Sequence, residues 1–190
     1  MLALTSWDLS DPDELEVSLS LELPRLLVAG GRKDELHVSS LVHIISQNES
    51  SQLSNSLPVT LYGSATLTRE NDNPVMCGGK TSYYERTSTC FSYQRDSSAW
   101  TDMDLPMIKP RYGAKSVFLQ DSQSFWVLGG ANDKSTEIFN GTNWQLGPEL
   151  PRSLSKFCLI DLQDGSFMII GGKLKLLIEI QCIFQVPFSK

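Results

Sequence analysis

Short apolar runs that each end in two adjacent glycines divide the chain into repeated units. Residues 125–128 lead into Gly129 and Gly130, and three other apolar runs end in the same way. The four doublets begin at residues 30, 78, 129 and 171, with spacings of 48, 51 and 42 residues. A period in this range is typical of repeated supersecondary units, not of one irregular domain. The doublet glycines are Gly30, Gly31, Gly78, Gly79, Gly129, Gly130, Gly171 and Gly172.

A second apolar segment precedes each run and predicts a two-stranded hairpin. Residues 15–23 alternate between apolar and polar side chains, which predicts a strand with one buried face. In the last unit, Asp164 and Gly165 separate residues 155–160 from 167–170, and Asp-Gly between apolar runs is a strong hairpin signal. Further first strands are predicted at residues 62–68 and 112–119, with the turns 71–73 and 121–123 after them.

The two middle units continue alike after their glycines. A polar loop leads to a third strand, predicted at residues 88–93 and 136–139, and a second polar turn leads to Trp100 or Trp144. A Leu-Pro pair and then Arg111 or Arg152 close each unit. Four short strands in this length match the size of a propeller blade. The predicted fold class is therefore all-β, a partial β-propeller of four-stranded antiparallel blades.

The repeated residue types have a direct physical role. Paired glycines permit backbone angles and close approaches that a side chain would block. A tryptophan supplies a large apolar surface with one polar N–H, which suits packing between neighbouring sheets. Since a single four-stranded sheet cannot bury both of its faces, the units are expected to stack.

Over residues 15–172 the chain resembles the kelch repeat. The kelch pattern is a glycine doublet, an aromatic residue about ten positions later, a tryptophan, and an arginine before the next first strand. Two consecutive units match it, with Gly78, Gly79, Phe91 or Tyr93, Trp100 and Arg111, and with Gly129, Gly130, Phe139, Trp144 and Arg152. The resemblance implies a β-propeller that presents loops to binding partners.

The predicted division of the chain follows these units. Residues 1–14 form an acidic lead-in, 15–61 a degenerate blade with Leu53 in the tryptophan position, 62–111 and 112–152 two complete blades, and 153–190 a partial blade with an atypical tail. This indicates either a truncated or alternatively ended chain, or an open array that needs a partner. Unclosed sheet faces favour self-association.

Composition narrows the classes of partner and compartment. Apolar residues make up 41% and charged residues 20%, a globular balance. The net charge of −6 and the absence of a basic run argue against a nucleic-acid surface. No apolar run approaches the roughly 20 residues that span a bilayer, so no membrane association is expected. The N-terminal residues lack the features of a signal peptide, which predicts a cytoplasmic protein as written and an extracellular one if the N-terminus is incomplete.

The cysteines and two sequons keep the extracellular alternative open. Cys77 and Cys90 fall on predicted antiparallel neighbours, where the sulfurs could come within bridging reach. A disulfide would indicate an oxidising compartment, and the alternative is two buried free thiols. Asn48 and Asn140 begin Asn-x-Ser/Thr triplets on predicted turns, so both are candidate glycosylation sites. Cys158 and Cys182 are interpreted as core residues.

Candidate binding chemistry concentrates on the arginines that close each unit. The kelch resemblance places Arg111 and Arg152 near one mouth of a propeller, where arginines can grip acidic peptides. The structural alternative is an arginine that donates to loop carbonyls of a neighbouring blade. His37 and His43, with Asp34 and Glu35, fit no usual metal-ligand spacing, and the glycine pairs are not followed by a helix. Neither a metal nor another cofactor is expected.

Three functional hypotheses follow. The first is a non-enzymatic module that binds another protein or peptide through loops on one rim of a rigid repeat. The second is a secreted, disulfide-bearing kelch-like protein that binds an extracellular ligand or glycan. The third is an enzyme built on a propeller, which the chain's residues do not favour because no catalytic set is recognisable.

Overall fold

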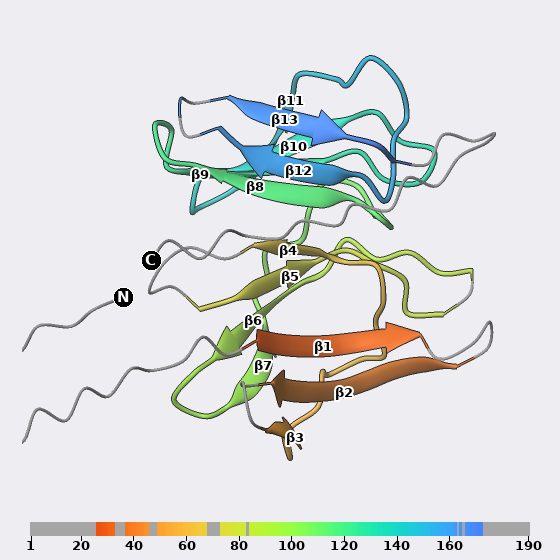
Figure 1. The fold of residues 1–190 in the computed structure, drawn as a ribbon, viewed down its shortest axis with the longest axis vertical. Coiled ribbons are helices and arrows are strands. Elements are labelled where there is room, and N and C mark those ends of the chain that lie inside the picture. The colour runs from red at the N-terminus through yellow and green to blue at the C-terminus, as the bar shows by residue number, and fades with distance from the viewer. Residues whose placement is uncertain are drawn as a thin grey trace, which may run out of the picture.

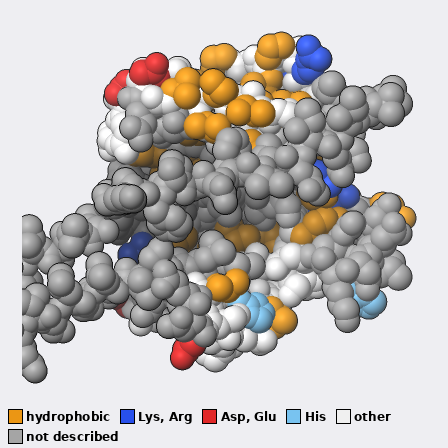
Figure 2. Space-filling view, viewed as in Figure 1, with side chains coloured by type: hydrophobic (Ala, Val, Ile, Leu, Met, Phe, Trp, Pro, Cys, Tyr) orange, Lys and Arg blue, Asp and Glu red, His pale blue; other side chains and the backbone are white. Residues whose placement is uncertain are grey.

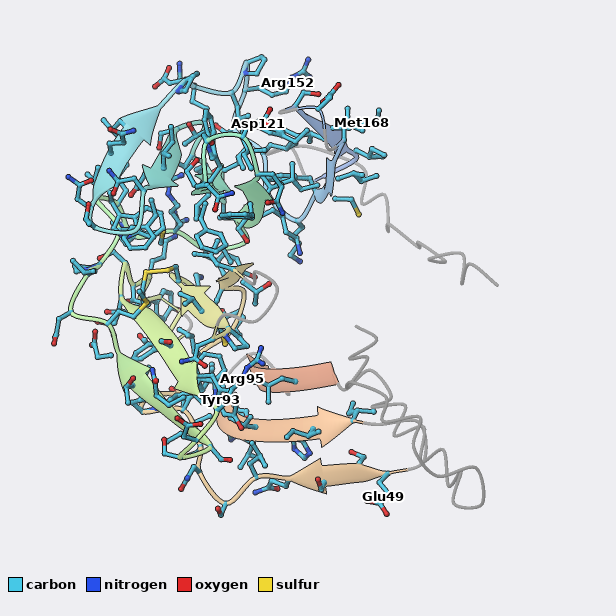
Figure 3. The ribbon with its side chains drawn as sticks, turned by 90° about the vertical axis from the view of Figure 1, so that its left-hand side faces the viewer. Glu49, Tyr93, Arg95, Asp121, Arg152 and Met168 are labelled. Atoms are coloured by element: carbon cyan, nitrogen blue, oxygen red, sulfur yellow. A yellow bond between two sulfur atoms is a disulfide. The ribbon has the colours of Figure 1, made fainter. Side chains whose placement is uncertain are left out.

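All regular secondary structure in the described part of the chain is β-strand. The computed structural model describes residues 26–32, 37–45, 49–67, 73–82, 84–162, 164 and 166–172. The strands form four antiparallel sheets that follow one another in chain order along an arc (Figures 1 and 3). The predicted all-β class with four-stranded antiparallel sheets is confirmed. The predicted lead-in of residues 1–14, the strand over 15–23 and the tail after Gly172 lie outside the described residues.

The two middle sheets are complete four-stranded units. The first runs in the order β4 (Ala65–Leu67), β5 (Val75–Cys77), β6 (Cys90–Gln94) and β7 (Ala99–Asp102). The second runs in the order β8 (Lys115–Leu119), β9 (Ser124–Leu128), β10 (Thr136–Phe139) and β11 (Trp144–Gly147). Consecutive strands are therefore hydrogen-bonded neighbours, as expected where short turns join antiparallel strands.

The outer two sheets have fewer described strands. One holds β1 (Leu26–Arg32), β2 (Val38–Ile45) and β3 (Ser50–Gln52), with an irregular register between Ala29 and Gly31. The other holds β12 (Cys158–Asp161) paired with β13 (Phe167–Ile170). Each of the four sheets lies within one of the predicted units.

The first strands begin about three residues later than the pattern predicts, because each is preceded by a left-handed residue. Gly63 and Gly113 have φ angles of 69° and 70°, and Lys156 takes φ 53° at the corresponding place. These residues bind one another across units instead of joining a sheet. The Gly113 N–H donates to Gly63 O at 2.8 Å, and the Lys156 N–H donates to Gly113 O at 3.0 Å.

The hydrophobic cores lie between neighbouring sheets, which agrees with the expected stacking. Trp100 on β7 packs against the preceding sheet, in a cluster with Val42, Leu57, Leu61, Met76, Phe91 and Tyr93. Trp144 on β11 packs in the same way against a cluster that includes Leu67, Met107 and Val127. Its indole N–H donates to Leu105 O at 3.0 Å. Each tryptophan thus joins its own sheet to the one before it.

The glycine doublets let the segment that leads into the next unit approach closely. The second glycine of three doublets donates its N–H to a carbonyl some 24 to 32 residues later: Gly31 to Leu61, Gly79 to Arg111 and Gly130 to Leu154. A Cβ added at Gly129 would stand 2.5 Å from Leu154 O, and its φ is 62°. Any other residue would clash with the entering chain, which explains the repeated doublet.

Candidate functional site

Two sets of loops meet at one end of the sheets and form a continuous surface, here called the loop face. One set follows the glycine doublets, and the other leads from the last strand of a unit into the next. The Ala131 N–H donates to Tyr112 O at 2.8 Å, and Arg86 Nη1 donates to Ala131 O at 2.9 Å, so each loop is bound to its neighbour. The loop face comprises Thr60, Lys80, Tyr84, Glu85, Arg86, Ile108, Lys109, Lys134, Arg152 and Lys156.

Arg111 lies beneath this surface, and its guanidinium has no solvent exposure. Nη1 donates to Gly129 O at 2.8 Å and to Ser135 O at 2.7 Å. Nη2 donates to Ser135 Oγ and to Glu137 Oε1, each at 2.8 Å, and Nε donates to Glu137 Oε1 at 3.1 Å. The side chain enters the loop of the following unit and binds there. A rim role for Arg111 is therefore wrong, because the arginine is buried and all of its donors are engaged inside the chain.

Glu137 on β10 is the counter-ion that sequence reasoning missed. Its side chain is fully buried, and besides Arg111 it accepts the backbone N–H groups of Ile108 at 2.7 Å and Lys109 at 3.0 Å. One carboxylate thus fixes both the arginine and the loop that delivers it. The sequence does hold a signal, since Glu137 is a charged residue within the strand, at the position where the previous unit has Phe91.

Asp133 adds a second carboxylate at the edge of this network. Its Oδ2 lies 3.5 Å from Arg111 Nη1, and its Oδ1 accepts both the N–H and the hydroxyl of Ser135. Partial burial works to raise the pKa of Asp133, but the two Ser135 hydrogen bonds and the charges of Arg111 and Lys109 outweigh it and lower the pKa below its ordinary value. The carboxylate is therefore held in its charged form at neutral pH.

Arg152 also precedes a first strand, but it is not the structural equivalent of Arg111. Leu154 O accepts the Gly130 N–H just as Arg111 O accepts that of Gly79, so Leu154 takes the Arg111 position one unit later. The Arg152 side chain is exposed, and among the described residues it has neither a hydrogen bond nor an ion pair. Figure 3 shows Arg152 at the outer edge of the molecule. Of the two candidate rim arginines, Arg152 alone is accessible to a partner in this structure.

Aromatic and aliphatic side chains accompany the cations on the loop face. Lys80 Nζ lies 5.0 Å from the ring centroid of Tyr112, whose ring meets that of Tyr62 edge-on at 5.3 Å. Tyr84 is 88% exposed and Ile108 is 51% exposed. Large exposed apolar and aromatic side chains beside cations are typical of residues that anchor a protein partner.

The structure contains a disulfide between Cys77 on β5 and Cys90 on β6, seen in Figure 3 as a yellow bond. The two cysteines are directly opposite in the strand register, with Cα atoms 4.1 Å apart. The neighbouring Gly78 N–H donates to Thr89 O, so the cysteines form a non-hydrogen-bonded pair, where antiparallel strands come closest. Cys158, interpreted from the sequence as a core residue, is also disulfide-bonded.

The other candidate residues do not form a reaction centre in the described part of the chain. Asn140 is exposed at the turn between β10 and β11, whereas Asn48 lies outside the described residues. His43 is on β2 and His37 precedes it, and the residues that the structure describes contain no group of three or more metal-ligating side chains. Within the same residues, no helix is long and apolar enough to cross a membrane.

Comparison with known proteins supports the fold and leaves the activity open. No protein-family model and no curated protein matches the chain. Among solved structures, one titled "Structure of YjhT" matches with a TM-score of 0.62 and 16% sequence identity. The match covers 73% of this chain and 54% of that one, so the chain spans about half the length of this neighbour. At this identity the likeness shows a shared all-β fold alone.

Proposed function

We propose that the chain is a non-enzymatic interaction module, part of a kelch-type β-propeller, that binds another protein or peptide through its loop face. The observation that carries this proposal is that the backbones of the loops are held by hydrogen bonds while side chains on the same loops are exposed. The buried Arg111–Glu137 pair and the hydrogen bonds from the glycine doublets fix the loop backbones. Tyr84, Ile108 and Arg152 project from the same loops into solvent.

The kelch assignment draws on two independent observations. The doublet, aromatic, tryptophan and arginine recur in two consecutive units of the sequence. In both units the second doublet glycine donates to the segment that leads into the next unit, and the tryptophan packs into the cluster between two sheets. The structural neighbour shares the fold over most of this chain. Repetition of contacts as well as of residues favours blades of one propeller over unrelated hairpins.

Charge on the loop face favours an acidic partner. Lys80, Arg86, Lys109, Arg152 and Lys156 gather there, although the whole chain carries a net charge of −6. The acidic residues nearby are largely engaged: Glu149 pairs with Lys134 at 2.6 Å, and Asp133 faces Arg111. Arginine and lysine on a rim mainly raise the association rate and select partners of opposite charge.

The test compares two exposed arginines at opposite ends of the sheets. Arg152 lies on the loop face, and Arg95 lies on the turn between β6 and β7 at the other end. We expect a fluorescent acidic peptide of mixed Glu and Tyr to bind the protein, and Arg152→Glu to weaken binding by about tenfold, roughly 1.4 kcal/mol. Tyr84→Ala is expected to weaken it as well, and Arg95→Glu to have little effect. Equal losses for Arg152→Glu and Arg95→Glu would contradict binding by the loop face.

A second candidate function, binding of an extracellular ligand by a secreted form, is favoured by the disulfides. Cys77 and Cys90 are both about 1% exposed, and disulfides persist mainly in oxidising compartments. The bridge closes a loop with a sequence separation of 13 residues, so its loss should cost about 3 kcal/mol. Alkylation of the natural protein in denaturant, before and after reduction, is the direct measurement. Labelling of Cys77 without reduction would favour an intracellular protein with free thiols.

A further inference from the structure

We propose that Asn140 carries an N-linked glycan, at the end of the sheets opposite the loop face. Asn140, Gly141 and Thr142 form the turn between β10 and β11, and all three residues are exposed. The triplet has the residue types that N-glycosylation requires. Unlike the proposed function, this inference depends on the turn and not on what the loop face binds.

The turn orients the acceptor amide in a specific way. Asn140 Oδ1 accepts three hydrogen bonds, from the Thr142 N–H at 3.0 Å, the Thr142 hydroxyl at 2.9 Å and the Asn143 N–H at 3.0 Å. Among the described residues, no group binds the Nδ2 amide nitrogen, which is the atom that would receive the sugar. The side-chain oxygen is thus held by the turn while the nitrogen remains available.

The surroundings have room for a large substituent. Gly141 has a φ of 96°, and no heavy atom lies within 4 Å of a Cβ built on it. Asn140 directly follows the last residue of β10, whereas the loop face lies before its first residue. Four residues of strand separate these two ends by about 13 Å. A glycan at Asn140 would therefore extend from the far end of the unit and leave Tyr84 and Arg152 uncovered.

The disulfides give independent support, because they form in the compartment where this modification takes place. Cys77 is bonded to Cys90, and Cys158 is disulfide-bonded as well. Oxidised cysteines and N-glycans both mark chains that pass through the secretory pathway.

The covalent step needs a co-reactant of defined class, an oligosaccharide joined to a lipid through a diphosphate. A bond forms between Asn140 Nδ2 and the anomeric carbon of that sugar, and the bond from this carbon to the phosphate oxygen breaks. Nδ2 loses one proton, and the lipid diphosphate leaves. No oxidation or reduction takes place.

The experiment is peptide mapping of the full chain, both from its natural source and after secretion from animal cells behind a cleavable leader. We expect the peptide that contains Asn140 to carry a glycan that peptide N-glycosidase releases, leaving aspartate at position 140. An Asn140 peptide that is entirely unmodified in the secreted, disulfide-bonded protein would overturn the proposal. This readout needs no variant, so a variant that fails to fold cannot obscure it.

Substitutions then test whether the sequon itself is required for the glycan. They are made in a protein that also carries Asn48→Gln, which removes the other Asn-x-Ser/Thr triplet. Asn140→Gln and Thr142→Ala should each abolish the glycan, whereas Thr142→Ser should retain it. Asn143→Gln is the matched control, since Asn143 lies in the same turn but begins no sequon. A glycan that persists in Asn140→Gln would contradict the assignment to Asn140.

Discussion

The two arginines that close consecutive units have opposite environments. Arg111 is buried with Glu137 and donates to three further groups, whereas Arg152 is exposed. The two arginines also occupy different places in the repeat, because Leu154 and not Arg152 makes the contact to a doublet glycine that Arg111 makes. Residues 129–137 supply the carbonyl groups, hydroxyl and carboxylate that receive Arg111. At this scale, identical residue types serve stability in one unit and are open to a partner in the next.

Replacement of Arg111 should therefore destabilise the fold far more than replacement of Arg152. Arg111→Met leaves the Glu137 carboxylate buried without its counter-charge, and we expect a loss of about 3–5 kcal/mol in the free energy of unfolding. Arg152→Met is the matched control, expected to change that free energy by no more than about 0.5 kcal/mol. Urea unfolding followed by tryptophan fluorescence measures both.

A double variant distinguishes loss of the pair from loss of packing. Glu137→Gln removes the buried charge and keeps one oxygen, which can replace either the acceptor of Ile108 or that of Lys109, since these two N–H groups donate to different carboxylate oxygens. The double variant with Arg111→Met should lose less free energy of unfolding than the sum of the losses in the two single variants, because no isolated buried charge remains. Strict additivity would show that the ion pair is not what Arg111 contributes.

The lowered pKa of Asp133 predicts that the folded chain loses stability on acidification. Because its pKa in the folded chain lies below the ordinary value of 3.8, the folded state binds this proton less readily than the unfolded state. The resulting stabilisation is fully present above about pH 3.8 and is lost as the pH falls through the folded pKa. Asp133→Asn should remove this part of the pH dependence. Thermal unfolding of both proteins across the acidic range measures it, and parallel profiles would contradict the role given to Asp133.

At the scale of elements, the glycine doublets join one unit to the next. The carbonyl of Leu154 accepts the Gly130 N–H at 2.8 Å, and it also lies where a Cβ of residue 129 would be. Arg111 O has the same relation to Gly79 and Gly78. The doublet thus provides both a hydrogen-bond donor and the space for its acceptor.

Alanine substitutions separate the two reasons for glycine at a doublet position, which are its positive φ and the close approach of another backbone segment. Gly129→Ala places a non-glycine residue in the left-handed region, which should lower the free energy of unfolding by about 1–2 kcal/mol. The added Cβ would also lie 2.5 Å from Leu154 O, and the backbone movement that relieves this contact should cost about 2 kcal/mol more. Gly141→Ala has the positive φ but open space, so only the first cost applies. Chemical denaturation of the two variants should show Gly129→Ala as clearly less stable. Equal effects would mean that close approach is unimportant.

At the scale of the whole molecule, exposed apolar side chains gather over the upper sheets, as Figure 2 shows. Met168 on β13 is 46% exposed and Leu162, just after β12, is 43% exposed. In the described part of the chain, β12 and β13 form a sheet of two strands, whereas the middle units have four. We propose that this sheet associates with a second copy or with further blades, since exposed apolar side chains favour association.

Light scattering coupled to size exclusion tests this association. We expect the chain to elute as an oligomer, and Met168→Glu to shift it toward the monomer because a charge would be buried in the contact. Ile108→Glu is the matched control, since Ile108 is equally apolar and 51% exposed but lies on the loop face. A monodisperse monomer of the unaltered chain would contradict the idea.

Much of the architecture was predictable because its determinants are local. The glycine doublets, the apolar runs before them and the polar turns predict where most strands and hairpins fall. They also place Cys77 and Cys90 on neighbouring antiparallel strands, and the structure pairs the two residues directly opposite each other. The same reasoning missed the late start of β4 and β8, because Gly63 and Gly113 bind each other across units.

The sequence by itself determined the repeat, the strand-rich class and the residues that mark each unit, because these depend on neighbours within one hairpin. Only the tertiary structure decided which side chains are accessible. The burial of Arg111 depends on Glu137, 26 residues later, and the packing of Trp100 depends on the sheet before its own. Contacts between units are absent from any local pattern, so the sequence alone did not show which of the two arginines is buried.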